Sequence, residues 1–332
     1  MTVTIREVAR AAGVSQATAA RVLGGYGYAS PAARERVGHS AARLGYTPNA
    51  VARALVARAT MAVGLVVGDI QNPFFAGCAR GLADVLEPAG YTVLLANADE
   101  DAGRERSALD ALRARRVDGL VVVPAPEARL EEIVRAGVPL VQLDRAVRGV
   151  RADAVMVDNG AASARAVDHL LELGHRRIGL VSDSPQISSS AERIAGYRRA
   201  LRRAGLGVDA SLESIGGSTQ ADGRRSAHAL LSRPDRPTAI FTANNFMTVG
   251  ALLAMRDLGL RAPEDVALVG FDDLDWTTLV EPAVTVVAQP VADLGRAAGE
   301  RLLARMGGDD GPPRRIRLRT TLVVRASCGA RA

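Results

Sequence analysis

The feature that most constrains this fold is the alternation, from Met61 onward, of short apolar runs with longer stretches of helical apolar spacing. A strand, a helix and a second strand pack onto one sheet with a right-handed crossover, so the alternation predicts parallel sheets covered by helices. The expected strands are 62–67, 92–96, 119–123, 140–143, 155–158, 178–182, 239–242, 266–270 and 285–287. The expected helices are 74–87, 104–115, 130–136, 161–173, 191–204, 223–231, 246–258 and 293–306.

Open parallel sheets bind their ligands at the carboxyl ends of the strands, so polar or aromatic residues near those ends are candidates for a binding site. Carboxylates, amides, an arginine and an aromatic ring suit a polyhydroxylated ligand such as a sugar. Phe74 and Phe75 could equally pack the wall of a cleft, and Asp272-Asp273 could cap the following loop. The candidates are Asp69, Asn72, Phe74, Phe75, Asp144, Arg193, Asn244, Phe246, Asp272, Trp276 and Gln289.

The charge of the chain is concentrated at its N-terminus. Residues 1–60 hold eight arginines and two acidic residues, so this segment accounts for the whole net charge of +6, and the remainder is balanced. A basic segment attached to a neutral body indicates a module that binds a polyanion such as nucleic acid. A solvated basic surface without a partner is the plainer alternative.

Three short helices are predicted in this basic segment. Thr4 and Glu7 form a capping box for the first, Ser15 can cap the second, and Ser30 with Pro31 opens the third. Two helices joined at a glycine turn and closed by a third are typical of a helix-turn-helix domain, although a three-helix bundle without nucleic acid fits the same pattern.

The second helix of this arrangement would enter the major groove. Gln16 and Arg21 lie on its outward face and have the chemistry to read adenine and guanine, respectively. Ser15 and Thr18, and also Thr4, are better suited to phosphate contacts, which position a protein without specifying sequence. The following stretch, "YTPNAVARALVARAT", predicts a helix of about two turns, which is marginal in water without support. Two copies in a minor groove would support it; a flexible linker is the alternative.

Composition excludes several other classes. No lysine occurs, which removes Schiff-base enzymes and the P-loop lysine, and neither G-x-S-x-G nor H-E-x-x-H is present. The four histidines have no metal-ligand spacing, and Cys78 and Cys328 fit a reducing cytosol better than a disulfide framework. The N-terminus has no apolar region of the kind found in signal peptides, and no apolar run approaches the length of a membrane span. We therefore expect a cytoplasmic protein that has no cofactor, metal or membrane partner and is not an enzyme.

The chain resembles the LacI/GalR family of transcriptional regulators. The resemblance runs from about Thr4 to the C-terminus and depends on "TIREVARAAGVSQATAARVL", "ERVGHSAARLGYTPNAVARAL", "VGLVVGDIQNPFF", "LGHRRIGLV", "ERIAGYRRAL" and "VGFDD". It implies base-reading roles for Gln16, Ala17 and Arg21. It also implies that Leu55, with Asn49 and Ala52, contacts the minor groove from a hinge helix. Arg193, Asn244 and Asp272 fall on the family's effector-contacting positions.

The sequence departs from the family at several positions. Ala20 replaces a residue whose hydroxyl often touches phosphate, Gly24-Gly25 stands where an Asn is common, and Ala17 offers only a methyl group. Asn245 stands where the family usually has Asp. Ser218 falls at an effector position where some sugar-responsive members have Trp, so stacking is absent there.

These inferences combine into one prediction. We expect an all-α helix-turn-helix domain (1–46), a hinge helix or linker (47–60) and a periplasmic-binding-protein-like α/β core of two doubly wound subdomains (61–332). The resemblance assigns about 61–159 with 290–318 to one subdomain and about 160–289 with 319–332 to the other. The expected function is that of a homodimeric repressor, which binds a pseudo-palindromic operator in double-stranded DNA and is controlled by a sugar-like effector. The alternatives are a solute-binding protein or a sugar-modifying enzyme with the same body.

Overall fold

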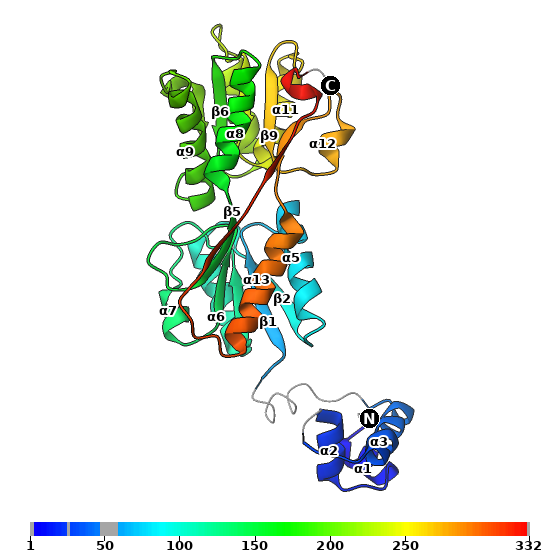
Figure 1. Cartoon of the computed structure of the whole chain (residues 1–332). Coiled ribbons are helices and arrows are strands. Elements are labelled where there is room, and N and C mark those ends of the chain that lie inside the picture. The colour runs from blue at the N-terminus through cyan, green and yellow to red at the C-terminus, as the bar shows by residue number, and fades with distance from the viewer. Residues whose placement is uncertain (1–2, 25–26, 47–58, 331–332) are drawn as a thin grey trace. The chain divides into compact units, whose positions relative to one another are not determined.

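The computed structural model describes residues 3–24, 27–46 and 59–330, which fall into two compact units (Figure 1). One unit comprises Met1–Ala62 with Arg116–Asp118, and the other comprises Val63–Arg115 with Gly119–Ala332.

The first unit contains three helices around a small core. They are α1 (Ile5–Ala11), α2 (Gln16–Gly24) and α3 (Pro31–Leu44). The Ser30 hydroxyl caps α3 by accepting a hydrogen bond from the Ala33 amide, and Gly45 ends it in the left-handed conformation at φ 64°. The core is formed by small and branched residues, Val8, Ala9, Ala12, Ala19, Val37 and Ala41. The predicted helix-turn-helix arrangement is therefore confirmed.

Most of the predicted hinge segment lies outside the described residues. Asn49, Ala52 and Leu55 belong to that part, so their roles stay predictions. Where the description resumes, the Asp118 carboxylate accepts hydrogen bonds from the backbone amides of Thr60 and Met61 at 2.9 and 2.8 Å. These bonds fix the chain just before the first strand.

The second unit contains two six-stranded sheets (Figure 1). The sheet of the N-lobe has the order β11-β5-β4-β3-β1-β2, and that of the C-lobe has the order β12-β10-β9-β8-β6-β7. Val63 pairs with Gly119 in the parallel β1–β3 ladder, whereas β12 pairs antiparallel with β10. The strands of the N-lobe are β1 (Ala62–Val67), β2 (Thr92–Asn97), β3 (Gly119–Val122), β4 (Leu140–Leu143), β5 (Asp153–Val157) and β11 (Arg315–Leu318). Those of the C-lobe are β6 (Ile178–Ser182), β7 (Glu213–Ile215), β8 (Ala239–Thr242), β9 (Ala267–Phe271), β10 (Thr285–Ala288) and β12 (Thr321–Val323).

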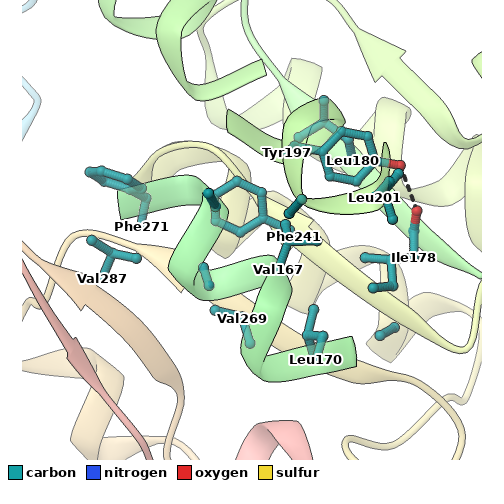
Figure 2. Close-up of a cluster of buried hydrophobic side chains, with 14 of the residues drawn as sticks. Val167, Leu170, Ile178, Leu180, Tyr197, Leu201, Phe241, Val269, Phe271 and Val287 are labelled. Carbon is teal, nitrogen blue, oxygen red and sulfur yellow. Dashed lines mark hydrogen bonds between the residues drawn. The ribbon is translucent and has the colours of Figure 1, made fainter. Parts of the chain in front are cut away.

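Helices cover both sheets. The N-lobe has α5 (Pro73–Leu86), α6 (Ala102–Ala114), α7 (Glu131–Arg135) and α13 (Val291–Met306), and the C-lobe has α8 (Asn159–Glu172), α9 (Ser188–Arg203), α10 (Gln220–Leu231), α11 (Asn245–Asp257) and α12 (Trp276–Leu279). α5 and α13 approach so closely that a Cβ at Gly81 would meet the Ala292 carbonyl oxygen at 2.0 Å. In the C-lobe core, the buried Tyr197 side chain donates its hydroxyl hydrogen to the Ile178 carbonyl at 2.7 Å (Figure 2). The buried phenol is therefore satisfied inside an apolar cluster.

The chain crosses between the lobes three times, between β5 and α8, between β10 and α13, and between β11 and β12 (Figure 1). Asp158 lies in the first crossing and Thr320 in the third, and the Asp158 carboxylate accepts hydrogen bonds from the amide and hydroxyl of Thr320 at 2.9 and 2.8 Å. Arg165 donates to the other Asp158 oxygen at 2.8 Å. Burial alone would raise the pKa of Asp158, but the bonds from Arg165 and Thr320 lower it. Two of the crossings are thus tied together by an ionised carboxylate.

The sequence did not predict β7, β11, β12 or α12. All three strands lie at the edges of their sheets and are only partly buried, so they lack the continuous apolar run that marks a central parallel strand. α12 is only four residues long, too short to show helical periodicity.

Candidate functional site

The predicted base-reading residues lie on α2. Gln16 and Ala17 are exposed, while Ala19 on the opposite side is buried in the core of the first unit. Arg21 is half-buried, because its guanidinium donates to the Ala17 carbonyl at 3.3 Å and to the Tyr28 carbonyl at 3.2 Å. The helix therefore presents one polar face, with Arg21 oriented by the loop that follows.

The hydroxyls that are predicted to contact phosphate also form hydrogen bonds inside the first unit. The Ser15 hydroxyl accepts from the Thr18 amide at 3.1 Å and lies 2.9 Å from the Thr18 hydroxyl, so Ser15 caps α2 as expected. The Thr4 hydroxyl donates to Glu7 at 2.9 Å. Tyr28, whose carbonyl accepts from Arg21, is 80% exposed, and no sequence pattern predicted a role for this aromatic ring.

In the second unit, a cavity of about 600 Å³ lies between the lobes, within the size range of ligand sites. Eleven of the twelve predicted effector-binding residues line it. They are Asp69, Asn72, Phe74, Phe75, Asp144, Arg193, Ser218, Asn244, Phe246, Asp272 and Gln289. Most follow a strand directly or by a few residues, because the carboxyl ends of both parallel sheets face this space. Residues chosen from the sequence because they lie near strand ends are therefore brought together at one cavity.

Two aspartates occupy equivalent positions in the lobes. Asp144 follows β4 and Asp272 follows β9, and both adopt left-handed backbone conformations, with φ 66° and 77°. Each donates its amide to the neighbouring strand, Asp144 to Val155 and Asp272 to Val287, at 2.9 Å. Left-handed non-glycine residues are costly and are found where the surrounding structure requires them, often at functional sites. Both carboxylates are thereby placed at the wall of the cavity.

Arg193 is held by three different contacts. It is 5% exposed, donates from Nε to Asn159 Oδ1 at 2.8 Å and from Nη1 to the Ala243 carbonyl at 2.6 Å, and its Cζ lies 3.8 Å from the centre of the Phe271 ring. Cation–π contact and hydrogen bonding therefore fix the guanidinium at the cavity.

Phe74 and Phe75 lie where the core of the N-lobe meets the cavity, which confirms that they pack its wall and leaves stacking on a ligand a prediction. They are buried in the N-lobe core and also line the cavity, with ring centres 5.2 Å apart in an edge-to-face arrangement. α5 begins just before them, since the Asn72 side chain accepts from the Phe74 amide and Pro73 occupies the first helical position. The helix start thus places the aromatic pair at the wall.

Trp276 is not among the residues that line the cavity, unlike the other predicted members. Its side chain is partly buried against a core cluster of the C-lobe, at the start of α12. The neighbouring Asp273 also has a different role: it accepts from Thr277 at 2.8 Å and from Arg325 at 2.9 Å, which matches the loop-capping alternative.

Asn245 connects the two lobes. Its side-chain amide donates to Asp272 Oδ2 and to Asn72 Oδ1, both at 2.9 Å, and Asn72 belongs to the N-lobe. Gln289, in the second crossing, donates to Asp272 Oδ1 at 2.6 Å. Asp272 therefore accepts hydrogen bonds from the start of α11 and from the second crossing. The amide at position 245 can bridge Asp272 and Asn72, because it donates a hydrogen bond to each and a carboxylate could not.

Other residues also line the cavity. Arg145 directly follows the candidate Asp144 in the sequence, is 4% exposed and donates to Glu100 Oε2 at 2.6 Å. Glu100 and Asp183 were not predicted; Asp183 is 7% exposed and accepts from Asn244 at 3.0 Å. Asp183 follows β6 directly, so the rule of strand ends could have found it. Glu100 follows β2 by three residues and is brought to the cavity by a turn with left-handed backbone at Asp99 and Glu100, which sequence spacing does not reveal.

Among the described residues, no group of three or more His, Cys, Asp or Glu side chains is placed to hold a metal ion. In the same ranges, no helix is both long and apolar enough to cross a bilayer.

Comparison with known proteins gives matches to both units. Residues 4–49 match the family model described as bacterial regulatory proteins, lacI family, and residues 167–328 match the periplasmic binding protein-like domain. Catabolite control protein A of Priestia megaterium is 36% identical over 308 residues, which cover 92% of each chain.

Two solved structures of transcription regulators are also similar to this chain. A complex of the transcriptional regulator CelR with cellobiose is 34% identical, covers 98% of this chain and 99% of that one, and has a TM-score of 0.75. The Lac repressor dimer bound to operator and the anti-inducer ONPF is 26% identical, covers 99% and 100%, and has a TM-score of 0.87. The relatives matched here are transcription regulators.

Proposed function

The chain belongs to the LacI family of bacterial regulatory proteins, and from that membership we propose that the cavity between its lobes is the effector site of a DNA-binding transcription regulator. The observation that carries the proposal is the convergence of eleven predicted side chains on one cavity. The effector is a sugar or sugar derivative, because the walls combine carboxylates, amides, an arginine and an aromatic pair, as polyhydroxylated ligands require.

The DNA-binding surface is assigned to the first unit. Gln16, Ala17 and Arg21 on α2 read bases in the major groove, and Thr4, Ser15 and Thr18 contact phosphates. Asn49, Ala52 and Leu55 contact the minor groove, where Leu55 acts as an apolar wedge. The exposure of Gln16 and Ala17 and the basic charge of residues 1–60 support this assignment.

Regulation follows from the two lobes. An effector that contacts both lobes changes their closure, which alters the spacing of two hinge segments in a homodimer and thereby the affinity for a pseudo-palindromic operator. We propose a repressor that acts in the cytoplasm, where the DNA is, with the domain boundaries predicted from the sequence. We also infer that it has no catalytic activity, because the matched relatives are transcription regulators.

The test begins with selection of DNA. Purified protein is mixed with fragments of its own genome at about 0.15 M salt, where nonspecific phosphate binding is partly suppressed, and the bound fraction is sequenced. We expect enrichment of a palindrome, and at least about fivefold weaker binding to it by Arg21→Ala, since one good base contact contributes about 1–3 kcal/mol of discrimination. Arg43→Ala, at the end of α3, is the control on a basic residue assigned no base contact.

The effector role is tested on the selected operator with a panel of sugars. One or more sugars should change operator affinity for the natural protein, and Arg193→Ala should lose that response while it keeps operator binding. If Arg193→Ala responds as the natural protein does, the cavity is not the effector site. If no palindrome is enriched, with or without the panel, the repressor assignment fails.

A further inference from the structure

The side chains that line the cavity between the lobes carry an unbalanced charge. Six carboxylates face only two guanidinium groups, and no histidine belongs to the lining. The carboxylates are those of Asp69, Asp99, Glu100, Asp144, Asp183 and Asp272, and the guanidinium groups are those of Arg145 and Arg193. Arg104, which does not belong to the lining, pairs with Asp99, so the described charges still leave an excess of carboxylates. An anionic ligand would therefore meet a negative wall.

Both cations are already engaged by the protein. Arg145 forms a buried ion pair with Glu100, with an N–O distance of 2.6 Å. Arg193 donates to Asn159 and to the Ala243 carbonyl, and its guanidinium lies over Phe271. Arg145 Nε remains a buried donor without a partner. Because the other bonds of both arginines are made within the protein, neither guanidinium offers a pair of parallel donors to a phosphate or carboxylate of a ligand.

The carboxylates, in contrast, keep free acceptor capacity. No residue in the described part of the chain donates a hydrogen bond to the Asp144 side chain, although it is buried at the wall. Asp183 Oδ1 and Gln289 Oε1 are buried without a partner in the same lining. Because buried acceptors are normally satisfied, the ligand that fits this wall must bring hydrogen-bond donors.

The carboxylates also repel one another across the space. Burial raises the pKa of Asp144, Asp272 and Asp183 raise it further, and Arg145 and Arg193 offset this only in part. Burial likewise raises the pKa of Glu100; Arg145 lowers it, and Asp144 and Asp183 add to the rise. A further negative charge would add to this repulsion, whereas hydroxyl or ammonium donors would relieve it.

We propose that this cavity selects polyhydroxylated ligands that carry no negative charge, neutral sugars or amino sugars, and rejects sugar phosphates and sugar acids. The proposal rests on the proposed function, in which the cavity is the effector site. Asp144 and Asp183 are the residues to which we assign the selection. Both carry a charge and keep acceptor capacity: no described residue donates to the Asp144 side chain, and Asp183 Oδ1 is unpaired. Gln289 Oε1 is also unpaired, but its amide is neutral and cannot repel an anion.

The test uses matched sugars with the full-length chain. Ribose is paired with ribose 5-phosphate, fructose with fructose 6-phosphate, galactose with galacturonate, and glucose with glucosamine, glucose 6-phosphate and gluconate. Binding is measured by thermal shift and calorimetry. The members that bind should be neutral or amino sugars. Their phosphate or acid counterparts should bind at least about tenfold more weakly, since the negative charge of the ligand would be repelled by the carboxylates of the wall. Loss of binding in Arg193→Ala assigns the binding to this cavity.

A pair of variants tests the cause. Asp144→Asn combined with Asp183→Asn should reduce the discrimination between a neutral sugar and its phosphate at least threefold, because two negative charges are removed at nearly constant shape. Asp110→Asn, an exposed carboxylate on α6, should leave the discrimination unchanged. If the double variant unfolds, the comparison of matched sugars with the natural protein still decides the question.

Three outcomes would overturn the proposal: an anionic sugar that binds within tenfold of its neutral partner, an anionic sugar that binds alone, or a panel in which no neutral or amino sugar binds. The operator assay separates this result from the proposed function. A neutral sugar that binds without changing operator affinity contradicts the regulatory role and leaves the charge selection intact. An anionic sugar that binds through Arg193 and changes operator affinity supports the regulatory role and contradicts the charge selection.

Discussion

At the scale of the residue, Glu105 shows how burial changes an acidic side chain that the sequence would place at a surface. It lies on α6, is 1% exposed, and accepts a hydrogen bond from the Ala125 amide at 2.6 Å. Burial raises its pKa to about 7, against the lowering effects of the Ala125 amide and Arg145. The folded protein therefore holds the proton more tightly than the unfolded chain does, and this contribution to stability is lost as the pH rises from about 4.5 to about 7.

We expect Glu105→Gln to remove this pH dependence, because glutamine keeps the acceptor but cannot ionise. At pH 8 the variant should be more stable than the natural protein by about 3 kcal/mol, and at pH 4.5 the difference should be near zero. Urea unfolding at both pH values measures it. Glu132→Gln, an exposed carboxylate nearby, is the control, and equal pH profiles for Glu105→Gln and the natural protein would contradict the prediction.

At the scale of the element, the three helices of the first unit depend on their caps. The core there consists of small side chains, so each helix buries little apolar area, and the first amides of α3 rely on the Ser30 hydroxyl. A short helix with few contacts is sensitive to the loss of a single capping bond.

Ser30→Ala should destabilise α3 by about 1 kcal/mol, because the Ala33 amide loses its acceptor. Faster amide exchange in residues 31–44 and a several-fold loss of operator affinity should follow. Ser30→Thr, which retains a capping hydroxyl, should behave almost like the natural protein. Unchanged exchange in Ser30→Ala would show that the cap contributes nothing to this helix.

At the scale of the whole molecule, the two lobes touch at few places in the structure. The Asn245 amide donates to Asn72, and the Ala146 amide of the N-lobe donates to the Ser188 hydroxyl of the C-lobe at 3.1 Å. Arg317, beside the third crossing, forms a two-bond ion pair with Glu192 of α9. Because each bond contributes about 1 kcal/mol net, a single one can shift the balance between open and closed forms several-fold.

Asn245→Ala should favour the open form, since it removes the bond to Asn72. The Ala146 amide should then exchange with solvent about fivefold faster, as expected for a loss of about 1 kcal/mol. Hydrogen exchange of peptides that contain Ala146 measures this. Arg256→Ala, on the exposed face of the same helix, is the matched control, and an Ala146 exchange rate equal in both variants would mean that Asn245 does not hold the lobes together.

The sequence by itself determined the helix-turn-helix unit, the central strands of both sheets, and most of the wall of the cavity. The reason is local in each case. Caps at Ser15 and Ser30 mark helix starts, buried strands appear as continuous apolar runs, and the ends of parallel strands face the ligand. Asp144 and Asp272 could be named because each directly follows such a run.

Only the tertiary structure decided which residues that are far apart in the sequence meet, both within the N-lobe and between the lobes. The pairing of Arg145 with Glu100, 45 residues away, and of Asn245 with Asn72, 173 residues away, leaves no trace in spacing or periodicity. Trp276 was expected at the cavity but is not among the residues that line it. The path of the chain between the end of a strand and such a ring is set by tertiary packing, which the sequence pattern does not show. The excess of carboxylates in the cavity is likewise a property of the assembled wall, because it arises from strand ends of two separate sheets that the three crossings bring together.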